Sequence, residues 1–288
     1  MRGSPRHPSK NMKDYIRMTK PKIVLLNILT ASTAHLMAGW TPASLLHLAV
    51  AGYLSVGGAS AVNHYVDRDV DAKMMRTAKR PIPSGRVKPI HGLVFGCALL
   101  SMSAVYSAVF LNYPTTTFVL LGAFIYILVY TLWLKRRSIW NIVIGGAAGS
   151  CSPLAGWAAS GGEITIVPML LALIVFLWTP GHFWALAIRA AKDYQAAGIP
   201  MLPVTHGLKF SASAVLVSNV AAVISSIVIA AYVPAPVVYL AVTLPASAWL
   251  LYESIRTVHL SSIAHAWRAF KASSPWLAIV FAALILAS

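Results

Sequence analysis

The stretch ASLLHLAVAGYLSVGGASAVNHYVDRDVD, residues 43–71, places a long apolar run directly before a cluster of carboxylates. Residues 43–66 are long enough to cross a bilayer as a helix, because a hydrocarbon core of about 30 Å takes about 20 apolar residues. Residues 67–71 then contain three of the seven acidic residues in the whole chain. The acidic cluster is therefore expected at the end of a membrane span, where the helix meets water.

Apolar stretches of similar length recur along the chain and predict an all-α, polytopic membrane protein, a bundle of nine transmembrane helices. The composition, 58% hydrophobic and 10% charged, is far from that of a soluble domain. Backbone groups in lipid must be hydrogen-bonded within their own segment, which favours helices over open sheets. We expect the spans at 22–40, 43–66, 91–111, 114–134, 139–158, 164–188, 211–232, 235–253 and 270–288.

The distribution of positive charge predicts the orientation of this bundle. All 23 Lys and Arg residues fall in five segments, namely 1–22, 67–91, 135–137, 189–209 and 254–271. The alternate connections hold none, which is the positive-inside pattern of a multi-span membrane protein. The N-terminus is then inside and the C-terminus outside. We expect residues 1–21 to form a cytoplasmic N-terminal segment and residues 22–288 to form the transmembrane domain.

The same charge distribution bears on location and partners. The net charge of +16 lies beside the helix ends, where it sets topology and meets anionic lipid head groups, so we expect contact with membrane lipid and none with nucleic acid. The chain opens without a long presequence, which favours a prokaryotic plasma membrane, with the acidic cluster on its cytoplasmic side. Cys97 and Cys151 stand alone in apolar spans and are interpreted as packing residues.

Three side chains of the opening stretch predict a metal site. Asn63, Asp67 and Asp71 recur every four residues and therefore lie along one helical face. Two carboxylates one turn apart repel each other unless a cation lies between them. Mg²⁺ suits this position, since it takes oxygen ligands and is commonly shared between carboxylates and a diphosphate. A solvated acidic helix end is the alternative. Asp69 and His64 are expected to project away from this face.

Basic residues near these carboxylates predict a diphosphate site. The loop that follows carries Arg76 and Arg80, and cations beside Mg²⁺ both bind a diphosphate and stabilise it as a leaving group. A role in membrane topology is the alternative for this loop taken alone. Two further segments on the same side supply more charge. We predict diphosphate contacts from Arg76, Arg80, Lys135, Arg189 and Lys192, and a further catalytic carboxylate at Asp193.

These motifs resemble a known family. An NxxxDxxxD motif after the second of nine helices, with a second Asp-bearing loop after the sixth, is similar to the intramembrane prenyltransferases of the UbiA superfamily. Further stretches resemble the branch of that superfamily that farnesylates protohaem IX. These stretches are 130–137, 141–149, 152–157, 179–187 and 192–203, together with Thr19-Lys20-Pro21-Lys22 before the first span.

The resemblance implies a reaction and its participants. Farnesyl diphosphate would donate its farnesyl group to a vinyl group of haem b, with addition of water, to give haem O and diphosphate. Asn63, Asp67, Asp71 and Asp193 would be the catalytic residues, with Mg²⁺ as cofactor. His182, an intramembrane histidine flanked by aromatic residues, is the predicted haem-binding residue, and a packed core histidine is its alternative. A haem A synthase or a terminal oxidase assembly pathway would be the partner.

Two other functions are weighed against this one. Prenylation of a quinone precursor or a lipid alcohol would be typical of superfamily members with a DxxxD pair in the second loop. Here Arg189 stands four residues before Asp193, which argues against that reaction and against a second Mg²⁺ held by two carboxylates. An ion transporter is expected to carry carboxylates deep within its spans, whereas every Asp here lies at a rim or in a loop.

Overall fold

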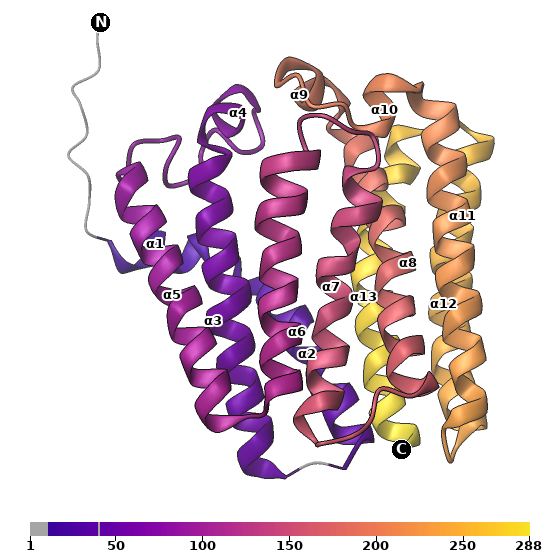
Figure 1. The fold of residues 1–288 in the computed structure, drawn as a ribbon. Helices are drawn as coiled ribbons and strands as arrows, with labels where there is room; N and C mark the ends of the chain where they lie inside the picture. Colours follow the sequence, from indigo (N-terminus) through magenta and orange to yellow (C-terminus); the bar gives the residue numbers. More distant parts are fainter. Residues whose placement is uncertain (1–10, 40) are drawn as a thin grey trace, which may run out of the picture.

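The computed structural model describes residues 11–39 and 41–288, and every regular element in these ranges is helical (Figure 1). The long helices are α2 (Pro21–Met37), α3 (Pro42–Val66), α5 (Pro89–Phe110), α6 (Tyr113–Phe124) with its π-helical continuation η1 (Ile125–Leu134), α7 (Asn141–Ala159), α8 (Ile166–Arg189), α11 (Gly207–Val228) with the 3-10 turn η2 (Ile229–Tyr232), α12 (Pro236–His259) and α13 (Ile263–Ala287). The short helices are α1 (Met12–Met18), α4 (Arg68–Lys73), α9 (Ala191–Ala196) and α10 (Leu202–Thr205).

The all-α membrane bundle predicted from the sequence is confirmed. Within the described residues, eight helices are long and apolar enough to cross a membrane. The first expected span corresponds to α2, which has 17 residues and packs against α3, α7 and α13. Residues 1–10 and 40 lie outside the described residues, and so do the start of the predicted N-terminal segment and the last residue of the first predicted span.

The predicted end of the eighth span and the predicted start of the ninth differ from the helices. The expected spans 235–253 and 270–288 leave a long basic connection, but α12 continues to His259 and α13 already begins at Ile263. Hydropathy marks where a helix crosses the hydrocarbon, and the helix itself continues into the polar zone when its inner face still packs. Buried Thr257 and Ala266 provide that packing on the two helices, so the basic segment is mostly helical.

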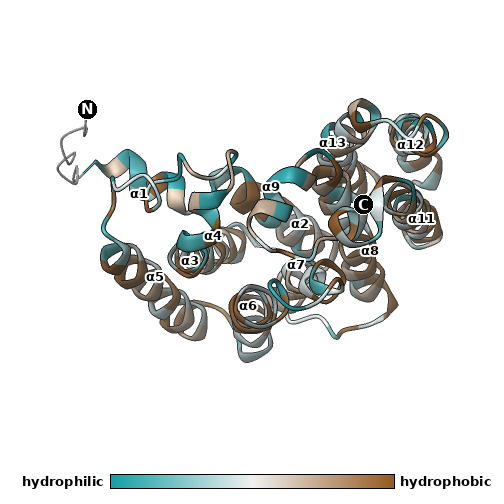
Figure 2. Cartoon of the chain, turned by 90° about the horizontal axis from the view of Figure 1, so that it is seen from above, coloured by the Kyte–Doolittle hydropathy of each residue, from teal (hydrophilic) through white to brown (hydrophobic). Residues whose placement is uncertain are grey.

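The polar connections gather at one end of the bundle. The short helices α4, α9 and α10 all lie at the same end, and the C-terminus lies at the opposite end (Figure 1). Seen from that polar end, the hydrophilic residues concentrate in α1, α4 and α9, above long helices that are mainly hydrophobic (Figure 2). The connections that hold the Asp residues of the predicted site therefore share one end, as the charge pattern predicts. Which side of a membrane this end faces stays a prediction.

Glycines allow some of the long helices to approach closely, as is common in membrane bundles. A Cβ atom on Gly156 of α7 would lie 1.9 Å from the carbonyl oxygen of Ala31 on α2. On α3 and α5, a Cβ on Gly58 would lie 2.9 Å from the carbonyl oxygen of Gly96. The obstacle in both places is backbone, which cannot move aside as a flexible side chain can. These helix pairs therefore depend on the missing side chain.

We predict that Gly156→Ala destabilises the bundle by about 1–3 kcal/mol, the usual cost of overpacking, because α2 and α7 must separate. Gly52→Ala on α3 is the matched control, since its new Cβ would meet only a side-chain carbon of Ile28 at 3.7 Å. The control is expected to be neutral or mildly stabilising, because Ala is the better helix former. Thermal unfolding of both variants in detergent measures the difference, and equal midpoints would contradict the prediction.

Candidate active site

The predicted face of Asn63, Asp67 and Asp71 exists and is fully enclosed. α3 ends at Val66 and α4 begins at Arg68, but the backbone bonds from Asp67 N to Asn63 O (2.9 Å) and from Asp71 N to Asp67 O (2.8 Å) carry the helical register across the junction. The three side chains therefore stay aligned. Asn63 is 2% exposed, and both Asp residues are 0% exposed.

Each buried carboxylate has one oxygen in use and one oxygen free. Oδ2 of Asp67 forms an ion pair with Lys135 and accepts a hydrogen bond from Nδ2 of Asn63 (2.7 Å). Oδ2 of Asp71 pairs with Nη1 of Arg80 at 2.7 Å. Oδ1 of Asp67 and Oδ1 of Asp71 are both buried without a hydrogen-bond partner. Such atoms are rare in native structures and usually mark a missing water, ion or ligand.

These two free oxygens fit a hard divalent cation. Mg²⁺ is typically held by one or two carboxylates together with water and phosphate oxygens, not by a complete protein cage. In agreement, the described residues contain no group of three His, Cys, Asp or Glu side chains that would hold a metal by themselves. Asn63 is already engaged on both sides, since its Oδ1 accepts a hydrogen bond from Lys20 and its Nδ2 donates to Asp67. Its amide orders the carboxylate beside it.

Lys20 is a member of this site that the sequence analysis did not assign to it. It precedes α2 with a left-handed backbone (φ 52°), an uncommon conformation for a residue with a side chain. Its Nζ donates to Oδ1 of Asn63 (2.8 Å) and to the hydroxyl of Tyr126 (3.0 Å). Burial, and then the positive charges of Arg80 and Lys135, lower the pKa of Lys20 to about 7. An anion bound beside Nζ would favour its charged form.

The π-helix η1 forms the wall of the site that faces α3. Its i→i+5 hydrogen bonds widen the helical turn, which brings Tyr126, Thr131 and Lys135 toward α3. The Thr131 hydroxyl accepts a hydrogen bond from Asn63 (3.2 Å), and Lys135 follows as the residue that ends η1. π-Helical turns occur frequently at functional sites. The sequence predicted Lys135 at the site, but not the widened helix that places it there.

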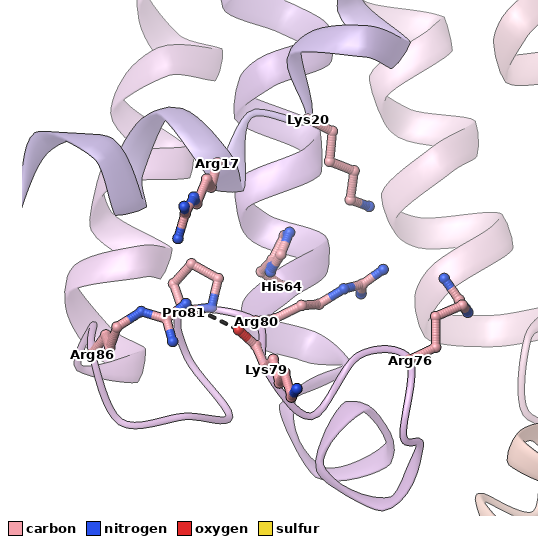
Figure 3. A pocket seen from close by; sticks show the side chains of 8 residues that line it. All are labelled: Arg17, Lys20, His64, Arg76, Lys79, Arg80, Pro81 and Arg86. Atoms are coloured by element: carbon pink, nitrogen blue, oxygen red, sulfur yellow. Dashed lines mark hydrogen bonds between the residues drawn. The ribbon is translucent and has the colours of Figure 1, made fainter.

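A cavity of about 360 Å³ adjoins this site, because Lys20 and Arg80 form part of its lining (Figure 3). Six of its eight lining residues are Lys or Arg, and none of the eight is acidic. They are Arg17, Lys20, His64, Arg76, Lys79, Arg80, Pro81 and Arg86. A cavity with this lining attracts a strongly anionic ligand such as a diphosphate, because Arg and Lys bind phosphate oxygens through short charge-assisted hydrogen bonds.

His64 lines the cavity, although the sequence analysis did not assign it to the site. Its ring lies in the middle of the cavity lining, between Arg17 and Arg80 (Figure 3). His64 is 3% exposed, and neither Nδ1 nor Nε2 has a hydrogen-bond partner. On the helix, His64 does turn away from the Asn63 face, but the loop after α4 folds back over that side. The cavity therefore extends around two faces of α3.

Asp193 anchors the basic loop. Its two carboxylate oxygens accept hydrogen bonds from the backbone N–H groups of Met75 and Arg76, each at 3.2 Å. Arg76 also reaches the hydroxyl of the neighbouring Tyr194 at 3.5 Å. α9 thereby holds the segment that carries one of the cavity cations. In the structure, the carboxylate of Asp193 contacts this loop. Other residues form the hydrogen bonds and ion pairs of Asp67 and Asp71.

Two predicted diphosphate contacts lie outside the cavity lining. Arg189 is exposed at the end of α8 and its guanidinium lies over the ring of Trp267, 4.8 Å from its centroid. Lys192 is also exposed, on α9. Their assignment to the diphosphate stays a prediction. Asp69 projects outward as predicted and forms an exposed pair with Arg136 (2.7 Å), which lowers the pKa of the Asp69 carboxyl.

His182 is packed within the bundle. Its Nδ1 lies 2.6 Å from the Ser273 hydroxyl, and its ring stacks on Trp178, with 4.6 Å between centroids. α8 is continuous through Pro180 and Gly181. The Ser218 hydroxyl bridges the backbone there, because it accepts a hydrogen bond from Gly181 N (2.8 Å) and donates one to Leu177 O. The haem-binding role of His182 stays a prediction.

Comparison with known proteins identifies the family of this chain. The model of the UbiA prenyltransferase family matches residues 24–286. The chain belongs to the UbiA prenyltransferase family. It is therefore a prenyltransferase and a multi-pass membrane protein, as the motifs indicated.

Relatives of known name narrow the position within the UbiA family. Protoheme IX farnesyltransferase 1 of Cenarchaeum symbiosum (strain A) is 41% identical over 282 residues, covering 95% of both chains. Protoheme IX farnesyltransferase of Metallosphaera sedula is 42% identical over 274 residues, covering 94% of this chain and 95% of its own. The resemblance to the haem-farnesylating branch is confirmed.

Solved structures share the UbiA fold at lower identity. The apo structure of a UbiA homologue from Aeropyrum pernix K1 matches with a TM-score of 0.75 and 21% identity, over 93% of this chain and 98% of that one. A UbiA homologue from Archaeoglobus fulgidus, bound to GPP and Mg²⁺, matches with a TM-score of 0.68 and 15% identity, over 94% and 99%. These likenesses support the fold alone.

We predict that Asp67→Asn and Asp71→Asn each lower prenyl transfer by about a hundredfold or more, the usual cost of losing one well-placed charge-stabilising group. Asp69→Asn is the matched control, because the exposed pair with Arg136 contributes at most about 1 kcal/mol to stability. Diphosphate release from a prenyl diphosphate measures all three variants. Comparable losses in the control and in the two buried variants would contradict the assignment.

We predict opposite effects of His64→Leu on stability and on binding. Removal of two unpartnered buried nitrogens is expected to raise the thermal unfolding midpoint of the free protein. Loss of a hydrogen bond to a charged ligand is expected to weaken inhibition by inorganic diphosphate about tenfold or more. His64→Gln, which keeps an N–H donor, is expected to retain part of that affinity. Unchanged inhibition in His64→Leu would return His64 to a packing role.

Proposed function

We propose that this chain is a protohaem IX farnesyltransferase (haem O synthase), which transfers the farnesyl group of farnesyl diphosphate to a vinyl group of haem b. Two kinds of observation support the proposal. The named relatives at about 40% identity span nearly the whole chain. The single observation in the structure that carries it is the pair of unpartnered Asp67 and Asp71 oxygens beside a cationic cavity, which suits the departure of a diphosphate.

The reaction divides into three steps. The bond between the allylic carbon and the diphosphate oxygen breaks, and the diphosphate leaves with the electron pair. The vinyl π electrons of haem b form the new carbon–carbon bond, which moves the positive charge onto the porphyrin side. Water adds there and loses a proton, giving the hydroxyethylfarnesyl group of haem O and free diphosphate. No covalent enzyme intermediate is required.

The side chains of the site act on the leaving group. Asp67 and Asp71 would hold Mg²⁺ through their free oxygens, with Asn63 as the third predicted ligand once Lys20 turns from its Oδ1 to the diphosphate. The metal, when bound, supplies positive charge to the diphosphate oxygens. In the structure, Lys135 and Arg80 neutralise the two carboxylates. A divalent cation would take over that role, and the N–H groups of Lys135 and Arg80 would then be free to bind the diphosphate. Lys20 and Arg76 lie beside them. Asp193 positions Arg76 through the loop backbone.

The remaining parts of the proposal concern substrate handling and location. The farnesyl chain is expected within the apolar bundle, with Tyr126 and Tyr130 at its head, because their rings stack beside Lys20 and Lys135. Haem b is the acceptor, with His182 as its predicted binding residue. We place the protein in a prokaryotic plasma membrane, and the Lys and Arg residues of the connections at this end support a site on the cytoplasmic side.

We predict that the purified protein, incubated with haem b, farnesyl diphosphate and Mg²⁺, yields haem O, detected by mass spectrometry of the extracted haems. EDTA should abolish the product, and added Mg²⁺ should restore it. The Asp67→Asn variant is the matched inactive control. Diphosphate release with unmodified haem b would mean that the acceptor is wrong, and quinone precursors would be tested next. Neither product from a folded sample would refute the transferase assignment.

A further inference from the structure

Five of the six cavity cations fall into two groups on either side of His64. Lys20, Arg80 and Arg76 lie on one side, and Arg17 and Arg86 lie on the other (Figure 3). The first group is tied to the metal motif, since Lys20 bonds Asn63 and Arg80 pairs with Asp71. The second group forms no hydrogen bond or ion pair with that motif in the described residues. It therefore needs an explanation of its own.

The second group is organised by a carboxylate from the N-terminal segment. Asp14 of α1 is 3% exposed, and its Oδ1 accepts a hydrogen bond from Nε of Arg86 at 3.0 Å. The same oxygen lies 3.6 Å from Nη1 of Arg17. Arg86 also donates from Nη2 to the carbonyl oxygen of Lys79 (3.0 Å), which closes the loop that covers the cavity. We call Asp14, Arg17 and Arg86 the Asp14 cluster.

The Asp14 cluster holds more positive than negative charge. One carboxylate faces two guanidinium groups, and no acidic residue lines the cavity beside them. Both guanidinium groups keep N–H donors beyond those that their bonds to Asp14 and Lys79 use, since a guanidinium carries five. These features together mark a binding place for an anionic group.

The diphosphate does not account for this second group. Mg²⁺ offsets much of the charge of a diphosphate, and the cations nearest the metal motif, Lys20, Arg80 and Lys135, suffice to meet the remainder. The acceptor of the proposed reaction brings further negative charge. Haem b carries two propionates at one edge of the porphyrin and its vinyl groups toward the opposite edge. A propionate held at the polar rim would direct the vinyl edge into the bundle.

We propose that Arg17 and Arg86 of the Asp14 cluster bind a propionate carboxylate of the haem acceptor. A guanidinium offers a planar pair of donors that matches a carboxylate, and Asp14 holds Arg86 in place to do so. The Arg17 side chain is 67% exposed, so the carboxylate reaches it from the water side of the membrane. The inference rests on the proposed function, because it names the acceptor group of that same reaction.

Esterified haem tests the proposal. The dimethyl ester of haem b keeps the vinyl groups but lacks the carboxylate charge. The wild-type protein is expected to use haem b with a kcat/KM about tenfold or more above that of the ester, the usual worth of a hydrogen bond to a charged group. In Arg17→Gln and in Arg86→Gln this preference is expected to shrink, through a higher KM for haem b. The KM for farnesyl diphosphate is expected to stay unchanged.

Two controls separate this role from general effects of charge and folding. Arg68→Gln removes a cation at the same end of the bundle that stacks on Tyr65 and lies outside the cavity lining, so it should keep the wild-type preference. Arg17→Gln changes an exposed side chain and is expected to fold, even if Arg86→Gln does not. Each variant is assayed in neutral lipid, and again with anionic phospholipid or inorganic phosphate added.

Each contrary outcome has a distinct meaning. Equal use of the ester and of haem b by the wild type, or an undiminished preference in Arg17→Gln, would overturn the propionate assignment while farnesyl transfer stood. A raised KM for farnesyl diphosphate would assign the cluster to the diphosphate instead. Wild-type activity that depends on anionic phospholipid or phosphate, with this dependence lost in Arg17→Gln, would assign it to those anions. Absence of any farnesylated haem in the wild type would instead refute the proposed function.

Discussion

Two carboxylates one helical turn apart, both removed from solvent at the end of a membrane helix, impose the main constraint on this structure. Buried charges are stable only when they are paired, and like charges at this spacing repel each other. Asp67 and Asp71 therefore draw in Lys135 from η1 and Arg80 from the following loop. The arrangement of one whole end of the bundle, including its covering loop, follows from the need to supply these counter-charges.

The counter-charges come from segments far apart in the sequence, and a local feature of the structure holds each segment in place. Lys20 reaches the site because its left-handed backbone turns the chain between α1 and α2. Lys135 arrives at the end of a π-helix whose wider turn changes which residues face α3. The basic loop is fixed by Asp193 on one side and by Asp14 on the other. Each of these features is local, but the cavity is enclosed only by all of them together.

The sequence predicted those parts that depend on short-range periodicity. Spans of apolar residues and the four-residue spacing of Asn63, Asp67 and Asp71 follow from helix geometry alone, and both are present. What covers a helix face is decided by distant segments, so a helical projection placed His64 correctly on α3 but missed the loop folded over it. Asp193 is predicted from the sequence as a catalytic carboxylate, and periodicity does not reveal its hydrogen bonds to the loop backbone, because those partners stand more than a hundred positions earlier.

The free protein keeps this end of the bundle incompletely satisfied. Of the eight buried side-chain atoms without a partner in the described residues, four belong to His64, Asp67 and Asp71. Each such atom costs about 1–3 kcal/mol relative to a satisfied one. In a core that serves packing alone, unpartnered polar atoms would be scattered or replaced by apolar side chains. Their concentration beside a cationic cavity is typical of a binding site. A ligand that supplies a divalent cation and phosphate oxygens would satisfy these atoms at once, so binding and stability at this end of the bundle are thermodynamically linked.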